Sequence, residues 1–415
     1  MSKADAMKVL IITPYLGPVY GGISAVVPEI VRALGKQQPY GQSLSIDLVT
    51  TNANDTTHLD VPLDQWIAHD HHRVRYFASW HRNDFILSGG LLRWLWQNVE
   101  SYDLVHSHTL FTPLLDAAHS ICQYKQVPYI MTPHGMLEPW ALAYKAWKKR
   151  LYFKWVEARS LKKAAAIQAL TTVEIEQIQS LGFQQTLLVP NGIHAKQFES
   201  LPSAQLFYEA YPQLKEKDCI LFLGRIDPKK GLDLLAQAFA QVSKAYPNTH
   251  LIVAGPDSIN FMPTARSYFA EANCLENVTF TGMVKGELKR SMLAAAQIYV
   301  APSYSEGFSM SILEGMASSL PCVFTTHCNF HEAQAANAAQ EVEADGDAIA
   351  QAILKYLRSP QQAKETGDRA RQFVFDHYTW DSIARQLADS YVDLLTTSSS
   401  ATAPASTATH SAIWS

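Results

Sequence analysis

Two cations and two carboxylates in the second half of the chain are spaced so that they could contact one extended, negatively charged ligand that carries hydroxyl groups. Arg225 and Lys230 come directly after the apolar run Ile220 to Leu223. A guanidinium and an ammonium that lie together stabilise a diphosphate through charge-assisted hydrogen bonds. Glu306 and Glu314 follow a later apolar run, and carboxylates accept hydrogen bonds from sugar and ribose hydroxyls.

Some of these charged residues also have a purely structural interpretation. A solvated basic turn would account for Lys229 and, less readily, for Arg225, and Glu306 is favoured near a helix N-terminus by the macrodipole. The macrodipole does not account for Glu314, which lies further inside the predicted helix. The carboxylate pair therefore favours a binding role.

The first half contributes a glycine pair and a histidine. Gly21 and Gly22 precede a predicted helix, where glycines let backbone amides approach an anionic group, although a flexible turn accounts for them as well. The loop lacks the G-x-G-x-x-G spacing, and the second predicted strand ends at Asn52 without the acidic residue of a dinucleotide site. His134 also follows a predicted strand, and both a ligand contact and a structural role remain open for it.

Composition excludes several classes of partner. The formal net charge is -4, with 34 Lys plus Arg against 38 Asp plus Glu, so we expect no nucleic-acid partner. Asp70-His71-His72 and His106-x-His108 are isolated groups, and the sequence has no D-x-D type cluster, so we expect no metal and no cofactor.

Five scattered cysteines without C-x-x-C spacing favour reduced thiols and a cytoplasmic location. No apolar run is long enough for a signal peptide or a membrane span.

The elements that must position these residues are short β-branched runs alternating with helical patterns, in two series along the chain. This alternation predicts an α/β protein with two Rossmann-like, doubly wound parallel sheets. Ligands bind at the carboxyl ends of such strands, so we expect the site in a cleft between the two domains.

Turn signals between residues 192 and 216 mark the predicted domain boundary. We expect a first domain over residues 1–200, a second over 201–375, and a helix over 376–395. The segment 396–415 is rich in Ser, Thr, Ala and Pro and is predicted to be a disordered tail.

With its motifs in this order, the chain resembles the retaining glycosyltransferases of family 4, which have the GT-B fold of two Rossmann-like domains. The resemblance covers the chain to about residue 392 and rests on Gly21-Gly22, Thr132 to Gly135, Pro190-Asn191-Gly192, Gly224-Arg225 with Lys230, and Glu306 to Glu314. It implies that the C-terminal helix returns to the first domain. Two stretches depart from the family pattern, Ser318-Ser319 and Thr326 to Phe330, and we expect them to affect only helix packing and a neighbouring turn.

The resemblance implies a retaining hexosyltransferase that uses a nucleotide-sugar donor and a glycan or lipid-linked acceptor, without a metal. Arg225 and Lys230 would bind the diphosphate, Glu306 the donor sugar, Glu314 the ribose, and His134 the sugar from the opposite domain. The remaining donor contacts would come from Gly21, Gly22, Asn191, Gly224, Met283, Gly307, Phe308 and Ser309. Two alternatives remain open, a non-catalytic nucleotide-sugar or carbohydrate-binding protein and a GT-B nucleotide-sugar epimerase.

The segment 140–163 holds eight Lys or Arg residues against one acid, Glu157, and many aromatic residues. A basic aromatic helix of this kind favours a peripheral contact with an anionic membrane surface, here the inner face of the cytoplasmic membrane. A long helix with one solvated face is the structural alternative.

Overall fold

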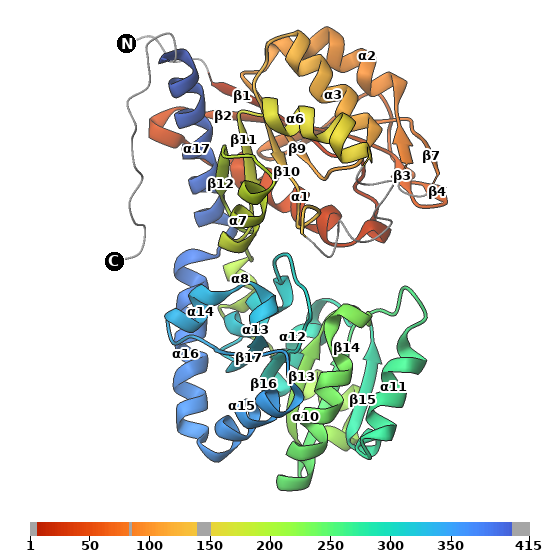
Figure 1. Ribbon diagram of the computed structural model, residues 1–415, viewed down its shortest axis with the longest axis vertical. Coiled ribbons are helices and arrows are strands. Elements are labelled where there is room, and N and C mark those ends of the chain that lie inside the picture. The colour runs from red at the N-terminus through yellow and green to blue at the C-terminus, as the bar shows by residue number, and fades with distance from the viewer. Residues whose placement is uncertain (1–5, 83–84, 139–150, 401–415) are drawn as a thin grey trace.

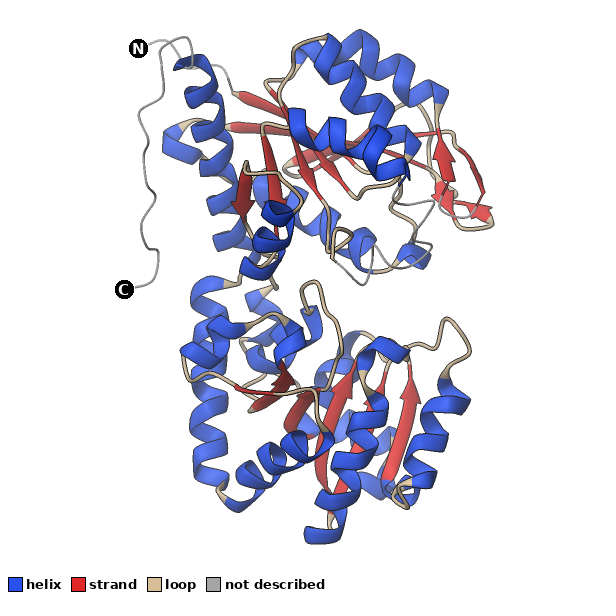
Figure 2. Ribbon diagram, viewed as in Figure 1, coloured by secondary structure: helices blue, strands red, loops and turns tan. Residues whose placement is uncertain are grey.

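The computed structural model describes residues 6–82, 85–138 and 151–400, and it arranges them in two α/β domains stacked along the long axis (Figure 1). In each domain, helices cover both faces of a central sheet (Figure 2). The predicted pair of Rossmann-like domains is confirmed.

The first domain is built on a sheet with the strand order β12-β11-β10-β9-β1-β2-β6-β5. All of its pairs are parallel except β5 with β6, an antiparallel edge that the sequence patterns did not predict. The strands are β1 (Met7–Ile12), β2 (Leu44–Thr51), β5 (Trp66–His69), β6 (His72–Phe77), β9 (Leu104–His108), β10 (Tyr129–Thr132), β11 (Ala166–Ala169) and β12 (Thr186–Leu188). Strands β9, β10 and β11 are buried along their whole length, as expected for a parallel sheet covered on both faces.

Helices and two small antiparallel pairs complete this domain. The helices are α1 (Gly22–Leu34), α2 (Gly89–Asn98), α3 (Pro113–Tyr124), α6 (Ala158–Lys163) and α7 (Thr172–Ser180), with a π-helical turn over Phe153–Glu157 before α6. The antiparallel pairs are β3 (Ala53–Asn54) with β4 (Thr57–His58), and β7 (Trp80–Arg82) with β8 (Phe85–Leu87). Short helices α8 (Ala195–Phe198) and α9 (Gln205–Ala210) follow β12 and lead to the second sheet.

The second sheet has the order β15-β14-β13-β16-β17-β18, and all its pairs are parallel. Its strands are β13 (Asp218–Leu223), β14 (Thr249–Ala254), β15 (Val278–Gly282), β16 (Ala296–Ala301), β17 (Cys322–Thr325) and β18 (Gln340–Val342). Its helices are α10 (Leu232–Ala245), α11 (Met262–Glu271), α12 (Gly286–Ala295), α13 (Met310–Ala317), α14 (His331–Ala335), α15 (Gly346–Arg358) and α16 (Pro360–His377).

The last helix, α17 (Trp380–Ser400), lies against α1 of the first domain (Figure 1). Its apolar side chains, among them Trp380, Leu387 and Tyr391, belong to the same buried cluster as residues of α1, β1 and β2. The helix continues to Ser400, so the predicted tail begins too early. The Thr396 and Thr397 hydroxyls donate to the carbonyls of Val392 and Asp393, one turn back. The rest of that tail, 401–415, lies outside the described residues.

A polar chain inside the first domain ties α17 to the sheet. Tyr391 lies 2.6 Å from Nδ1 of His106, and His106 Nε2 lies 2.7 Å from Thr132 Oγ1. Thr132 donates to Gln168 Oε1, whose amide nitrogen donates to Val189 O. Because the Thr132 hydrogen is used on Gln168, His106 must donate through Nε2 and accept at Nδ1 from the Tyr391 hydroxyl.

All five cysteines are buried free thiols. Among the helices of the described ranges, none is long and apolar enough to cross a membrane.

Candidate active site at the domain interface

The loop after β13 carries the predicted diphosphate-binding cations. Asp227 caps the 3-10 turn Pro228–Lys230 by accepting from Lys229 N at 3.1 Å, and Gly231 ends the turn with φ +65°. A Cβ on Gly231 would lie 1.9 Å from the carbonyl oxygen of Pro302, so only glycine permits this approach. The close contact brings the loop after β13 against the loop after β16.

Lys230 consequently forms a buried ion pair with Oε1 of Glu306, and Ser303 Oγ donates to the same oxygen at 2.8 Å. Burial acts to raise the pKa of Glu306, but the neighbouring Lys230 and Lys229 together lower it below its ordinary value. The carboxylate is therefore ionised and held in one orientation.

Three cations gather beside this carboxylate. Burial lowers the pKa of Lys229, Glu306 opposes that shift, and the charges of Lys230 and Arg225 add to it. These mutual effects indicate that the three cations share one region, in which Arg225 is the exposed member. Gly224 lies beside them, because its ideal Cβ would be 3.7 Å from Lys230 Cε.

Residues of the stretch Thr326 to Phe330 also fix the backbone of Glu306. Glu306 N donates to His327 O at 3.0 Å, and Asn329 Nδ2 donates to Glu306 O at 2.7 Å. Asn329 adopts φ +54°, a left-handed conformation that asparagine tolerates. The stretch Thr326 to Phe330 therefore supports Glu306 directly, and the expectation that it affects only a neighbouring turn is wrong.

Helix α13 begins just after this loop and carries Glu314. The carboxylate of Glu314 pairs with Lys289 of α12 at 2.7 Å, a partner that the sequence did not single out. Ser309 is the residue before α13, and its hydroxyl lies 3.2 Å from that of Ser311. The ring of Phe308 stacks on Tyr378, so this side chain packs inward.

The first domain presents the turn that follows β10. His134 and Gly135 both have left-handed backbones, with φ +54° and +76°. His134 Nε2 lies 3.1 Å from Nδ1 of His108, and burial lowers the pKa of His134 to about 4. The imidazole is therefore neutral and already hydrogen-bonded through one nitrogen.

The two domains touch where this turn meets the Glu306 loop. A Cβ built on Gly135 would lie 3.3 Å from Gly307 Cα, so the two backbones are in contact. Ser305 Oγ donates to Oε2 of Glu138 at 3.1 Å across the same interface. The structure thus brings the residue after His134 against the residue after Glu306.

The other residues predicted to contact the donor are Gly21, Gly22, Asn191 and Met283. Gly21 has φ +75° with no atom within 4 Å of an ideal Cβ, and Gly22 begins α1. Gly22 likewise has no atom within 4 Å of an ideal Cβ. Asn191 is buried in the linker after β12, and Met283 is 54% exposed after β15.

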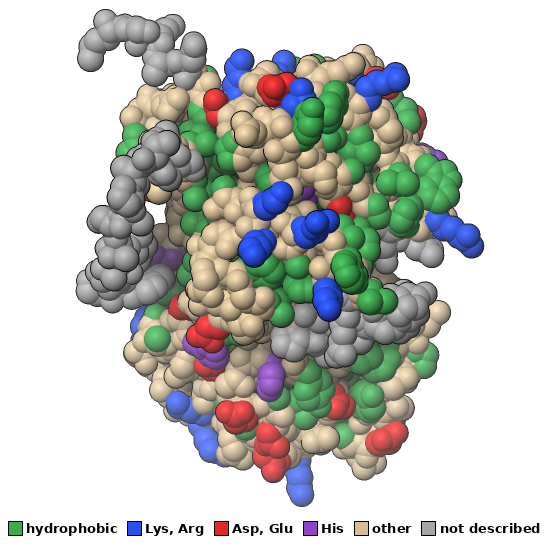
Figure 3. All heavy atoms as spheres, turned by 45° about the horizontal axis from the view of Figure 1, so that its top comes forward, with side chains coloured by type: hydrophobic (Ala, Val, Ile, Leu, Met, Phe, Trp, Pro, Cys, Tyr) green, Lys and Arg blue, Asp and Glu red, His purple; other side chains and the backbone are tan. Residues whose placement is uncertain are grey.

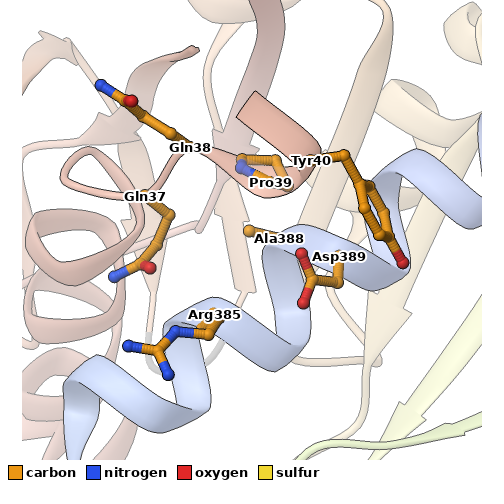
Figure 4. A pocket seen from close by; sticks show the side chains of 7 residues that line it. All are labelled: Gln37, Gln38, Pro39, Tyr40, Arg385, Ala388 and Asp389. Atoms are coloured by element: carbon orange, nitrogen blue, oxygen red, sulfur yellow. The ribbon is translucent and has the colours of Figure 1, made fainter. Parts of the chain in front are cut away.

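Two cavities lie away from these residues. One, of about 280 Å³, opens between Pro39 and α17, where Tyr40, Arg385 and Asp389 line it (Figure 4). The other, of about 210 Å³, is lined by α1, the linker after Ile193 and the start of α17. Neither is lined by a residue predicted to bind the donor.

Two facing Rossmann-like domains whose strand-end loops meet in this way define the GT-B class. Residues 207–373 match the family described as glycosyl transferases group 1, and residues 20–197 match glycosyltransferase family 4. The chain belongs to this family of glycosyltransferases.

Among characterised relatives, the chain is similar to a phosphatidyl-myo-inositol mannosyltransferase from Mycobacterium leprae, with 22% identity, covering 95% of this chain and 98% of the relative. It is also 25% identical to an alpha-maltose-1-phosphate synthase from Mycolicibacterium smegmatis, covering 71% of this chain and 80% of that protein.

Solved structures share the fold. Sucrose-phosphate synthase from Thermosynechococcus elongatus superposes with a TM-score of 0.71 at 23% identity, covering 94% of this chain and 100% of that one. Anabaena HepE, in complex with UDP and glucose, gives 0.70 at 15% identity, covering 93% and 99%.

Proposed function

We propose that this protein transfers a hexose from a nucleoside diphosphate sugar to a glycan or lipid-linked acceptor, with retention of anomeric configuration, in polysaccharide or glycoconjugate synthesis. The observation that carries the proposal is the buried Lys230–Glu306 pair at the interface, flanked by Lys229 and Arg225. This arrangement offers positive charge to a diphosphate and a fixed carboxylate to sugar hydroxyls.

In this scheme, cleavage of the sugar–phosphate bond leaves negative charge on the departing β-phosphate. Lys230 and Arg225 stabilise that charge, and each well-placed donor is worth about 3 to 4 kcal/mol at the transition state. We propose that these cations make a divalent metal unnecessary, and that the acceptor attacks from the face that the phosphate leaves, with the phosphate taking its proton. Turnover that survives EDTA supports the first point.

The donor is identified by a thermal-shift panel of nucleotide sugars. A donor that binds only the folded protein raises stability by about 2.7 kcal/mol at a hundred times its dissociation constant. The stabilising donor is then incubated with candidate acceptors and with none. Product that appears only with an acceptor supports a transferase, whereas product without acceptor favours an epimerase and binding without product favours a binding protein.

Variants test the residue roles. Lys230→Ala and Glu306→Ala should each reduce turnover at least about a hundredfold, the effect of one lost transition-state donor. Near-normal transfer by either folded variant would reject the assignment. Glu343→Gln, on an exposed site of the same domain, is the matched control.

We also propose that the acceptor is presented at an anionic membrane, with the protein cytoplasmic and peripheral to its inner face. Residues 140–150 of the predicted contact, 140–163, lie outside the described residues. Within the described part, Leu151 is 52% and Trp155 is 67% exposed, and Lys154 lies 5.9 Å from the Trp155 ring centroid. Basic and apolar side chains share one face of the first domain (Figure 3). Sedimentation with anionic but not with neutral vesicles at low salt supports this proposal, and no binding to either argues against it.

A further inference from the structure

The turn at His134 and Gly135 needs support from outside itself. A non-glycine residue in the left-handed region costs roughly 1 to 2 kcal/mol, so His134 at φ +54° persists only where its surroundings hold it. The turn's own backbone bonds, Met136 N to Pro133 O and Glu138 N to Gly135 O, are both 3.2 Å long. A stronger restraint comes from a distant helix.

That restraint is Glu174, in the first turn of α7. Its Oε1 accepts from Gly135 N at 2.8 Å, and its Oε2 accepts from Leu170 N at 2.7 Å. Thr171 caps the same helix by accepting from Glu174 N at 3.0 Å. In the usual T-x-x-E capping box, the glutamate reaches back to the backbone of the capping residue itself. Here the carboxylate instead bridges the residue before the cap and the turn after β10.

We propose that Glu174 is a positioning residue for sugar transfer, because its carboxylate holds the His134–Gly135 turn against Gly307. The role rests on the function proposed above. Since Gly135 and Gly307 meet backbone to backbone, no side chain can take up a displacement of the turn. A shift of about 1 Å in such a contact is enough to lower turnover about a hundredfold.

The burial of Glu174 supports this role. Its side chain is 1% exposed, and burial raises its pKa to about 7, although the bonds from Leu170 and Gly135 act in the opposite direction. A buried carboxylate is costly unless it is fully hydrogen-bonded. An ordinary helix cap does not need a second bond to a turn 39 residues away.

The test is Glu174→Gln, with Glu176→Gln as the matched control. Glutamine has the same shape, but it offers one acceptor oxygen and turns an NH₂ toward the other backbone donor. Glu176 lies on the same helix and is exposed. For each full-length variant, one measures kcat at saturating donor, the dissociation constant of UDP or GDP, whichever binds the wild type, and the melting temperature.

We expect Glu174→Gln to lower kcat by about ten- to a hundredfold, with nucleotide affinity within twofold of wild type, because the second-domain cations are untouched. Glu176→Gln should match wild type in all three measurements. A folded Glu174→Gln protein with wild-type kcat, or one that loses kcat and nucleotide affinity together, overturns the role.

If Glu174→Gln does not fold, Glu174→Asp, which keeps the charge but is one methylene shorter, takes its place under the same criteria. Absence of transfer by the wild type itself would overturn the proposed function and this role with it. Wild-type transfer with an unaffected variant overturns the role of Glu174 alone.

Discussion

Replacing Glu306 with glutamine should make the protein bind a nucleoside diphosphate more tightly while it transfers sugar more slowly. Glu306 and Lys230 neutralise each other, with side chains only 8% and 12% exposed. An incoming diphosphate must compete with the carboxylate for Lys230. The amide of glutamine keeps an acceptor oxygen for Lys230 and Ser303 but removes the competing negative charge.

The magnitude follows from the difference between two kinds of hydrogen bond. A bond to a charged group is worth about 1.5 to 3 kcal/mol net, and a neutral one about 0.5 to 1.5 kcal/mol. The bond between residue 306 and Lys230, which a diphosphate must displace, is therefore weaker in the variant by about 1 to 1.5 kcal/mol. Since 1.4 kcal/mol corresponds to a factor of ten, the affinity for the diphosphate should rise about tenfold. Turnover should fall about a hundredfold, because the carboxylate no longer contacts the sugar.

Titration calorimetry with UDP and GDP measures the affinity. These ligands lack the donor hexose, which is the group that Glu306 is proposed to bind. Initial rates at saturating donor measure kcat. Glu343→Gln should leave both quantities unchanged. If Glu306→Gln weakens nucleotide binding or leaves it unaltered, the carboxylate does not compete for Lys230, and the reasoning fails.

Three further predictions concern stability. Gly231→Ala should cost more than about 2 kcal/mol of unfolding free energy, whereas Gly286→Ala, at φ +59° in open space, should cost only about 1 kcal/mol, so urea titration of both isolates the clash. Burial raises the pKa of Glu157 to about 8, so the folded state keeps a proton that the unfolded chain releases. Stability is therefore lost as the pH rises from the ordinary pKa of a glutamate toward about 8. Glu157→Gln should therefore raise the melting temperature more at about pH 9 than at about pH 5, and an equal effect at both would contradict this sign. Tyr391→Phe should cost about 1 to 3 kcal/mol in thermal unfolding by leaving the buried Nδ1 of His106 without its donor, and an unchanged melting temperature would show that the bond contributes nothing.

The sequence predicted the sheets because fully buried parallel strands are continuous apolar runs, such as Leu251 to Ala254. It predicted the cations Arg225 and Lys230 and the carboxylates Glu306 and Glu314 because the members of each pair lie close together in sequence and each pair follows a strand. Lys230 and Glu306 are 76 residues apart, and their pairing depends on the close approach of Gly231 to Pro302, a contact that only the folded chain displays.

What the sequence could not predict was the support around these residues. Glu174 and Glu138 are single acids in ordinary surroundings, and only the geometry of the domain interface brings them to the turn after β10. Lys289 is one of several charges on an amphipathic helix, and nothing local marks it as the partner of Glu314. The T-x-x-E pattern at Thr171 is visible in the sequence, but it would have predicted a helix cap and not a bond to Gly135.

The return of α17 to the first domain has a consequence for how this protein is made. Domains generally fold as units while the chain emerges from the ribosome, the earliest first. Here the domain whose synthesis begins first lacks part of its interior until Trp380 to Tyr391 have left the exit tunnel. The second domain has all its strands by then, so the order of completion is reversed, and a nascent chain stalled before Trp380 would carry an unfinished first domain.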